Sequence, residues 1–364
     1  MRRMGLTATL AFLLSFTTAR AETIKIGAIL PLTGPGALIG TQQMRGIQFA
    51  IDQANAKGGV RGNTIEVVFE DNQARPDRSI LSFNKLTDLQ HLQVIFTAYS
   101  GPSLAMAPLA TRKKILLINA GAQAGKLATA SPFLINTLPM IGDEISVISK
   151  YMIGEGKKKA VILFENGAAG ISGRDEYIDA FPKAGGTILA QEPAQFGQTD
   201  FRPALLKLAD AKPDVMLVSI TAALLQMAQQ YKQLGLDFAV AGTTFFQDPD
   251  VIKEPSAEGF VHTQLRIEAP PELAAAFKAR FGAEMEFFVR QYYNATQIVL
   301  KTLDKVLADG QPVTGETMRD TVLKIRKFEG LIPLEFKTNT ATVPLDINVM
   351  RGGKDITIRR MSTD

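Results

Sequence analysis

The 364-residue sequence has no cysteine, no tryptophan and only two histidines. The absence of Cys excludes structural disulfides, thiolate metal sites and a Cys nucleophile, and two His exclude most histidine-rich metal sites. After the N-terminus no run of 18 or more apolar residues occurs, so we expect a soluble mature chain with no membrane anchor. Hydrophobic residues (46%) and charged residues (21%) are present in ordinary proportions, which excludes wholesale disorder.

The first 21 residues have the pattern of a secretory signal peptide. Arg2 and Arg3 form a basic start, residues 10–16 (LAFLLSF) form a short apolar run, and residues 19–21 (ARA) match a cleavage site. Cleavage removes three of the 40 basic residues and leaves 37 against 36 acidic ones, so the net charge falls from +4 to +1. The electrostatic argument for nucleic-acid binding is thereby lost. Export without an anchor predicts a location in the bacterial periplasm.

Short β-branched runs alternate with helix-length segments along the mature chain. Strands are predicted at 24–30, 65–70, 94–97, 115–118, 160–164, 187–190, 215–219 and 238–241. Helices are predicted at 41–57, 77–89, 103–112, 144–156, 174–184, 201–211 and 222–234. Such alternation is typical of parallel sheets flanked by helices, and it occurs in two consecutive series. We therefore predict an α/β fold with two doubly wound parallel-sheet lobes.

The last hundred residues break this rhythm. They predict three helices, at 271–281, 288–308 and 317–324, and then antiparallel strands with a hairpin turn at Gly352-Gly353. We expect this tail to complete both lobes, so that several chain crossings, the first near Leu138-Pro139, form the hinge. The predicted units are a signal peptide (1–21), an N-terminal lobe (22–139 and 265–341) and a C-terminal lobe (140–264 and 342–364).

No motif predicts catalysis, and we expect neither a cofactor nor a metal. The loop Gly34–Gly40 superficially resembles a dinucleotide fingerprint, but Pro35 removes a backbone donor and three residues separate the preceding strand from the first Gly. We interpret it as a loop at the lip of a cleft. His91 and His262 lack metal-ligand spacing, and no G-x-S-x-G or G-K-[ST] motif is present. Glu165 paired with Asp175 is too weak a signal to indicate an acid and a base.

Two loops carry more information than these motifs. Residues 99–103 (YSGPS) and residues 119–123 (NAGAQ) each follow a predicted parallel strand. Ligands of open α/β sheets bind at the carboxyl ends of the strands, and the helix start near Ser103 favours an anion such as a carboxylate. The alternative is that Ser100 or Ser103 is merely a helix N-cap.

At these loops the chain resembles a known family. The clearest stretches are residues 27–34 (GAILPLTG), Arg45-Gly46 and residues 50–62 (AIDQANAKGGVRG), with residues 328–330 (FEG) and 333–336 (PLEF) near the end. They resemble the leucine/isoleucine/valine-binding protein family, the type I periplasmic solute-binding proteins of ABC importers. The resemblance implies two α/β lobes that close on a ligand by bending at a hinge.

The resemblance also implies a grip for the ligand carboxylate. A Ser hydroxyl after the third strand and backbone groups of the next loop form this grip in the family, and by position they fall on Ser100, Gly121 and Gln123. Tyr99, Ala122 and Ile39 complete the candidate first-lobe set. Phe245, Phe246, Phe288, Tyr292 and Tyr293 are candidates for an apolar pocket wall.

The second lobe departs from the pattern of the amino-acid binders. Ala169 falls where they often have a Tyr, and Thr244 falls where they often have an acid, with Asp248 as a possible substitute if the register shifts. A buried ammonium without a charged partner costs several kcal/mol. The departure therefore favours a ligand with a carboxylate and no ammonium, such as an aromatic or aliphatic acid.

We predict a monomeric extracytoplasmic receptor that captures a small carboxylate-bearing solute between two lobes and delivers it to an inner-membrane ABC permease. An amino-acid receptor for Leu/Ile/Val-like ligands is the alternative of the same class. An exported α/β hydrolase or dehydrogenase is the alternative of another class. An acid opposite Ser100 would favour the amino acid.

Overall fold

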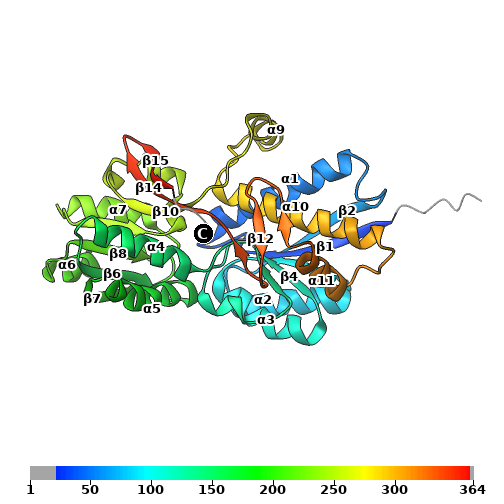
Figure 1. Cartoon of the computed structure of the whole chain (residues 1–364), viewed down its shortest axis with the longest axis horizontal. Coiled ribbons are helices and arrows are strands. Elements are labelled where there is room, and N and C mark those ends of the chain that lie inside the picture. Colours follow the sequence, from blue (N-terminus) through cyan, green and yellow to red (C-terminus); the bar gives the residue numbers. More distant parts are fainter. Residues whose placement is uncertain (1–21, 361–364) are drawn as a thin grey trace, which may run out of the picture.

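Two α/β lobes lie side by side in the computed structural model, which describes residues 22–360 (Figure 1). The predicted signal peptide lies outside the described residues. The first lobe is built on a five-stranded parallel sheet of order β2-β1-β3-β4-β5. Its strands are β1 (Thr23–Leu30), β2 (Thr64–Asp71), β3 (Val94–Thr97), β4 (Leu116–Asn119) and β5 (Leu134–Asn136). Strands β3, β4 and β5 are buried throughout, as expected of a parallel sheet covered by helices on both faces.

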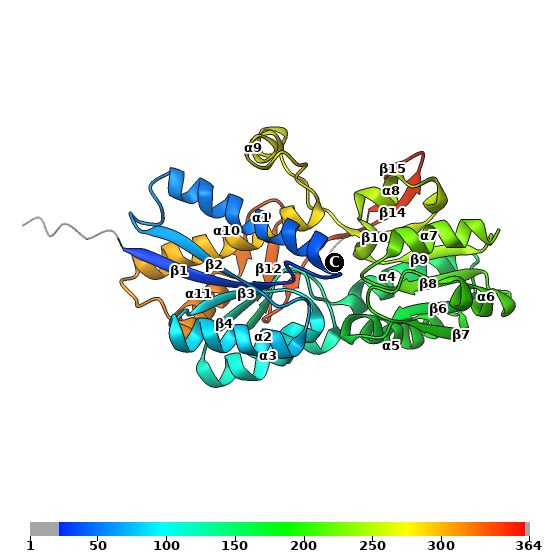
Figure 2. The same cartoon turned by 180° about the vertical axis from the view of Figure 1, so that it is seen from behind.

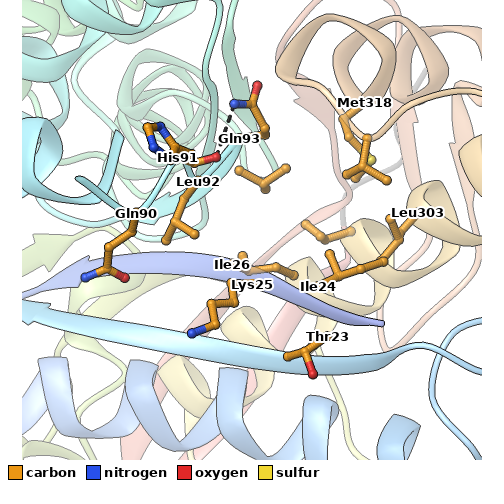
Figure 3. A pocket seen from close by; sticks show the side chains of 13 residues that line it. Thr23, Ile24, Lys25, Ile26, Gln90, His91, Leu92, Gln93, Leu303 and Met318 are labelled. Atoms are coloured by element: carbon orange, nitrogen blue, oxygen red, sulfur yellow. Dashed lines mark hydrogen bonds between the residues drawn. The ribbon is translucent and has the colours of Figure 1, made fainter. Parts of the chain in front are cut away.

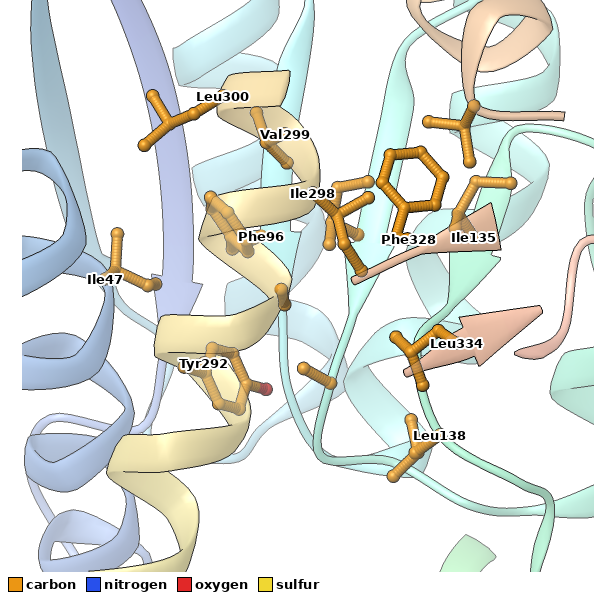
Figure 4. Packing of buried hydrophobic residues seen from close by; sticks show 14 of the residues in the cluster. Ile47, Phe96, Ile135, Leu138, Tyr292, Ile298, Val299, Leu300, Phe328 and Leu334 are labelled. Atoms are coloured by element: carbon orange, nitrogen blue, oxygen red, sulfur yellow. The ribbon is translucent and has the colours of Figure 1, made fainter. Parts of the chain in front are cut away.

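Helices from both ends of the chain cover the first sheet. They are α1 (Ala37–Ala56), α2 (Pro76–Asn84) with the π-helical turn η1 (Lys85–Leu89), α3 (Ser100–Lys113), the 3₁₀ turn η2 (Gly125–Ala128), α10 (Phe287–Ala308) and α11 (Gly315–Ile325). Helices α1 and α10 pack closely at Gly46, where an added Cβ would lie 2.4 Å from the carbonyl oxygen of Val289. Figure 4 shows the core beneath α10, where Phe96, Ile298 and Tyr292 pack together.

The second lobe contains a seven-stranded mixed sheet of order β15-β14-β10-β9-β8-β6-β7. The strands are β6 (Lys159–Glu165), β7 (Thr187–Ala194), β8 (Val215–Ser219), β9 (Ala239–Gly242), β10 (Val261–Leu265), β14 (Leu345–Arg351) and β15 (Lys354–Arg360). Strands β6 to β10 run parallel, whereas β14 pairs antiparallel with β10 and with β15. The turn between β14 and β15 has positive φ at Gly352 (58°) and Gly353 (68°), as predicted for a tight hairpin.

Four longer helices and three short ones accompany the second sheet and the return to the first. They are α4 (Ile141–Gly154), α5 (Ala168–Lys183), α6 (Arg202–Asp210), α7 (Leu224–Gln233), η3 (Thr244–Phe246), α8 (Pro249–Lys253) and η4 (Pro255–Ala257). Helix α9 (Pro271–Phe281) stands above the lobes in both views (Figures 1 and 2). Among residues 22–360 no helix has the length and apolar character needed to cross a bilayer.

The chain passes between the two sheets three times. It leaves β5 for α4, returns from β10 towards α10, and leaves the small antiparallel sheet β11 (Lys327–Phe328), β12 (Leu334–Phe336) and β13 (Ala341–Thr342) for β14. The α/β fold with two parallel-sheet lobes is as predicted.

Some element boundaries differ from the predicted ones. Helix α1 begins at Ala37 rather than at 41, and α3 begins at Ser100 rather than Ser103. Helix α1 starts shortly after Pro35 and α3 contains Gly101 and Pro102 in its first turn, and such residues are typical of loops. The earlier start of α3 puts Ser100 in its first turn.

Candidate ligand-binding site

Two adjoining cavities lie where the lobes meet, at the carboxyl ends of the parallel strands. The larger has a volume of about 190 Å³ and the smaller about 10 Å³, room for roughly one water molecule. Tyr99, Ser100, Ala169 and Thr221 line both. The smaller cavity is also lined by Ile39, Gly121, Phe245 and Phe288, and the larger by Ala74, Pro76, Gly101, Pro102, Glu165, Gly167, Ala168, Gly170 and Phe196. Both lobes therefore contribute to each cavity.

The two lobes also contact each other directly. The rings of Tyr99 and Phe196 meet edge to face with centroids 5.9 Å apart. The amide of Gly125 in the first lobe donates to Ser172 Oγ in the second at 3.0 Å. Together with the small cavity volumes, these contacts describe a closed arrangement.

Ser100 lies at the start of α3 and is 2% exposed. Its Oγ accepts a hydrogen bond from the amide of Ala124 at 3.2 Å and caps no amide of its own helix. A Ser hydroxyl that accepts one bond still has its proton to donate. Ser103 instead pairs with Thr97 Oγ1 at 2.9 Å, a structural role. Of the two serines, only Ser100 lines the cavities.

Tyr99 joins β3 to α3 with φ at 61°, a left-handed conformation that non-glycine residues rarely adopt. This turn places its ring in the cavity wall. Its hydroxyl is buried and has no hydrogen-bond partner among residues 22–360. Burial, with a smaller contribution from the charge of Glu165, raises the pKa of Tyr99, so the phenol is neutral at physiological pH.

The loop after β4 is held in place by a side chain of its own, Asn119. Asn119 Oδ1 accepts from the amides of Gly121 at 3.1 Å and Ala122 at 2.8 Å. Gly121 lines the smaller cavity, and an added Cβ there would lie 2.9 Å from Tyr292 Oη and 3.0 Å from Gln43 Nε2. Ala122 is buried and lines neither cavity. These two amides are not free donors, in contrast to the free backbone groups expected from the sequence.

Gln123 and Thr244 come together, although not around a cavity. The side chain of Gln123 and the amide of Thr244 (2.8 Å to Oε2) both donate to Glu144, a fully buried acid on α4. Thr263 donates to the same carboxylate through its hydroxyl. Glu144 thus joins the two lobes near the hinge. No pattern in the sequence singles Glu144 out.

Asp248, the possible substitute acid, caps α8 by accepting from the amide of Asp250 at 2.9 Å and lines neither cavity. Of the candidate wall aromatics, Phe245 and Phe288 line the smaller cavity. Phe246, Tyr292 and Tyr293 pack in the hydrophobic cores instead.

Glu165 supplies an acid that the sequence argument passed over. It ends β6, is 4% exposed and lines the larger cavity with Tyr99 and Ser100. Its Oε2 accepts from the amide of Thr221 at 3.0 Å and from the Thr221 hydroxyl, whereas Oε1 has no partner in the described part of the chain. Burial raises the pKa of this carboxyl.

Neither histidine lines the cavities. His262 is buried, with Nδ1 2.8 Å from the carbonyl oxygen of Thr263 and Nε2 3.0 Å from Asp355. His91 lines a separate cavity of about 290 Å³ at the other end of the first sheet, beside Thr23 and Ile24 (Figure 3). Ser100 therefore has no imidazole to activate it. Within residues 22–360 no group of three or more His, Cys, Asp or Glu is placed to hold a metal.

A family model described as periplasmic binding protein matches residues 23–355. The chain belongs to this family. Members are binding proteins rather than enzymes, in agreement with the sequence prediction. The resemblance stated from the sequence is likewise confirmed, because the curated relatives are Leu/Ile/Val-binding protein homologues.

One such relative is Leu/Ile/Val-binding protein homolog 6 of Brucella abortus (strain 2308), 26% identical over 213 residues. That match covers 58% of this chain and 54% of the relative, so the chain spans about half the length of the curated relatives matched first. The leucine-, isoleucine-, valine-, threonine- and alanine-binding protein of Pseudomonas aeruginosa is 27% identical, with 78% of this chain and 79% of that protein covered.

Solved structures have the same fold. A solute-binding protein of an ABC transporter from Rhodopseudomonas palustris BisB5, in complex with 3,4-dihydroxybenzoic acid, matches with a TM-score of 0.84 at 25% identity, over 94% of this chain and 98% of that chain. LivJ of Streptococcus pneumoniae, in complex with isoleucine, matches with a TM-score of 0.82 at 22% identity, over 93% and 99%. Members of this fold thus bind both benzoates and amino acids.

Proposed function

We propose that this chain is the extracytoplasmic receptor of an ABC importer of the branched-chain-amino-acid type, and that it captures a small carboxylate-bearing solute between its lobes. The observation that carries the proposal is the pair of interlobe cavities lined by Ser100 from one lobe and Thr221 from the other. The leader pattern of residues 1–21 and the family support a periplasmic location. The closed receptor then docks on a separate membrane permease.

We place the carboxylate of the ligand beside Ser100. The hydroxyl there has a proton to donate, and α3 begins at this residue, so the positive end of the helix dipole faces the cavity. Gly121 of the neighbouring loop lines the smaller cavity beside Ser100. A carboxylate at this point gains a charge-assisted hydrogen bond without a cation in the wall.

The remaining walls favour an aromatic or aliphatic acid. Ile39, Phe245 and Phe288 line the smaller cavity, and Phe196 lines the larger. Among residues 22–360 no Lys or Arg side chain lines either cavity. The larger cavity, at about 190 Å³, is of the size that holds one ring, since about 150 Å³ suffices for benzene in a protein core.

A Leu/Ile/Val-like amino acid is the second candidate, and Glu165 is the observation that favours it. This carboxyl stands in the second lobe opposite Ser100 and provides the charged partner that Thr244 does not. It weakens the argument from a missing acid.

Differential scanning fluorimetry and calorimetric titration of the purified protein test the proposal. Benzoate, 4-hydroxybenzoate, isovalerate and leucine form the panel, because a ligand that binds only the native state raises its melting temperature. We expect at least one acid without an ammonium to bind. Ser100→Ala lowers that affinity about tenfold or more, as expected for a hydrogen bond to a charged group. Ser256→Ala, a second-lobe serine outside both cavities, leaves it unchanged.

Binding of leucine-like compounds alone would contradict the preference for acids without an ammonium. Unchanged affinity in Ser100→Ala would contradict the placement of the carboxylate.

A further inference from the structure

The lobe junction contains more unpartnered polar atoms than a carboxylate needs. Buried polar side-chain atoms in proteins nearly always have a hydrogen-bond partner, so each exception requires an explanation. Tyr99 Oη and Glu165 Oε1 are both exceptions among the described residues, and both residues line the larger cavity. They come from opposite lobes, which excludes a purely local folding role for the pair.

Glu165 is held in place by its other oxygen. The amide of Thr221 and its hydroxyl both donate to Oε2, so the carboxyl cannot rotate without breaking two bonds. Oε1 is therefore a fixed acceptor. A fixed buried acceptor without a donor is costly in the empty protein and is satisfied only when a ligand brings the donor.

The lining residues of the two cavities place the polar groups at two ends of the site. Gly121 lines only the smaller cavity and Glu165 only the larger, whereas Ser100 and Tyr99 line both. In an α-amino acid the carboxylate and the ammonium are attached to the same carbon. A ligand that satisfies both ends of this site instead has its second polar group at the far side of its body.

An ammonium also fits the acceptor count poorly. It carries three protons to donate, while Glu165 Oε1 and Tyr99 Oη are the two unpartnered side-chain acceptors that the described residues bring to the larger cavity. A hydroxyl has one proton to give and lone pairs to receive one from Tyr99. The neutral group therefore matches both unpartnered atoms.

We propose, resting on the proposed function, that Glu165 is a specificity-determining residue that accepts a hydrogen bond from a ligand hydroxyl, so that the solute is a hydroxy acid with the hydroxyl distal to the carboxylate. Tyr99 Oη completes the contact. A 4-hydroxybenzoate-type molecule has this chemistry: a carboxylate for Ser100, a ring for the Phe walls and a hydroxyl for Glu165.

Calorimetric titration with three ring acids tests the inference on the unaltered protein. Benzoate, 4-methylbenzoate and 4-hydroxybenzoate differ only in the distal group. We expect 4-hydroxybenzoate to bind about tenfold or more tightly than 4-methylbenzoate, as expected for a hydrogen bond to a carboxylate. Equal affinities would overturn the inference and leave the proposed receptor function standing.

Two variants then test whether Glu165 causes the higher affinity for 4-hydroxybenzoate. In Glu165→Gln the amide oxygen must face Thr221, which leaves an NH₂ group where Oε1 was, and Glu165→Met removes the acceptor altogether. Both reduce the advantage of 4-hydroxybenzoate over 4-methylbenzoate to about threefold or less. Glu155→Gln, an exposed acid after α4, keeps the full advantage.

The remaining outcomes are also decisive. An unchanged ratio in both Glu165 variants overturns the inference. Binding of leucine that is abolished in both variants overturns it in favour of an ammonium partner. If no ring acid, isovalerate or leucine binds the unaltered protein, the proposed function itself fails, and the inference fails with it.

Discussion

At the scale of single residues, the site is a small set of polar groups in apolar walls. The sequence placed Ser100, Tyr99 and Gly121 at strand ends, and all three line the cavities together with Ile39 and Ala169. Their binding role stays a prediction. Strand ends can be predicted because β-branched runs and their flanking small residues are local signals. Which way each side chain points depends on the neighbouring strand and the facing lobe.

Gln123, Ala122 and Thr244 illustrate that limit. Each lies in a loop of the expected kind, but Gln123 and Thr244 are bound by Glu144, and the amide of Ala122 is bound by Asn119. Glu165 was considered only as a possible catalytic acid and set aside, and Thr221 was not singled out, for the opposite reason. Glu165 and Thr221 are 56 positions apart in the sequence but hydrogen-bonded in the fold, and no sequence spacing indicates that contact.

Glu165 makes the stability of the empty protein depend on pH. Its folded pKa lies above the ordinary value, so between the unfolded and folded values the native state binds more protons, and stability falls as pH rises through that window. We expect Glu165→Gln to melt at a higher temperature than the unaltered protein at pH 7. The difference shrinks as pH falls towards 4, where the carboxyl is neutral in both states. Scanning calorimetry without ligand at pH 4, 5.5 and 7 measures it. A difference that is constant with pH would contradict the assigned shift.

At the scale of elements, the positions of strands were predicted better than the ends of helices. β1 to β4 and β6 to β9 lie where the β-branched runs predicted them, whereas α1 and α3 begin earlier and β5 was not predicted. Strand β5 has only three residues, which is too few to show the periodic pattern of apolar residues that predicts a strand. The early start of α3 matters for function, because it puts Ser100 rather than Ser103 at the helix start.

The close contact between α1 and α10 requires a glycine at position 46. Gly46→Ala places a Cβ 2.4 Å from the carbonyl oxygen of Val289, so the helices must move apart. We expect the free energy of unfolding to fall by about 2 kcal/mol, as is usual for overpacking in a core. Gly154→Ala is the matched control, since nothing lies within 4 Å of its added Cβ and Ala favours the helix. Urea denaturation of both variants decides the point, and a Gly46→Ala protein as stable as the control would be contrary to this packing.

At the scale of the whole molecule, the proposed function requires that the lobes separate and close. A ligand shifts such an equilibrium only by its differential contacts with the two forms, and residues of both lobes line the cavities. We expect the closed arrangement to admit no solute, because the lobes contact each other between Tyr99 and Phe196 and between Gly125 and Ser172.

A disulfide between the two lobes tests this gating, and the chain has no other cysteine to interfere. In Gly125→Cys with Ser172→Cys, the new Cβ at 125 lies 3.9 Å from the present Ser172 Oγ, within reach of a bond after small adjustment. We expect the oxidised double variant to take up and release ligand at least tenfold more slowly than the reduced one. Each single-Cys variant serves as control. Equal exchange rates in stopped-flow experiments on oxidised and reduced protein would show that the solute enters without opening.

The most direct test of the account is a crystal structure of the protein with 4-hydroxybenzoate bound. The account predicts the ring between the two lobes, with the carboxylate within hydrogen-bond distance of Ser100 Oγ and the hydroxyl within hydrogen-bond distance of Glu165 Oε1. A ring bound outside the lobe junction, or a carboxylate turned away from Ser100, would contradict it.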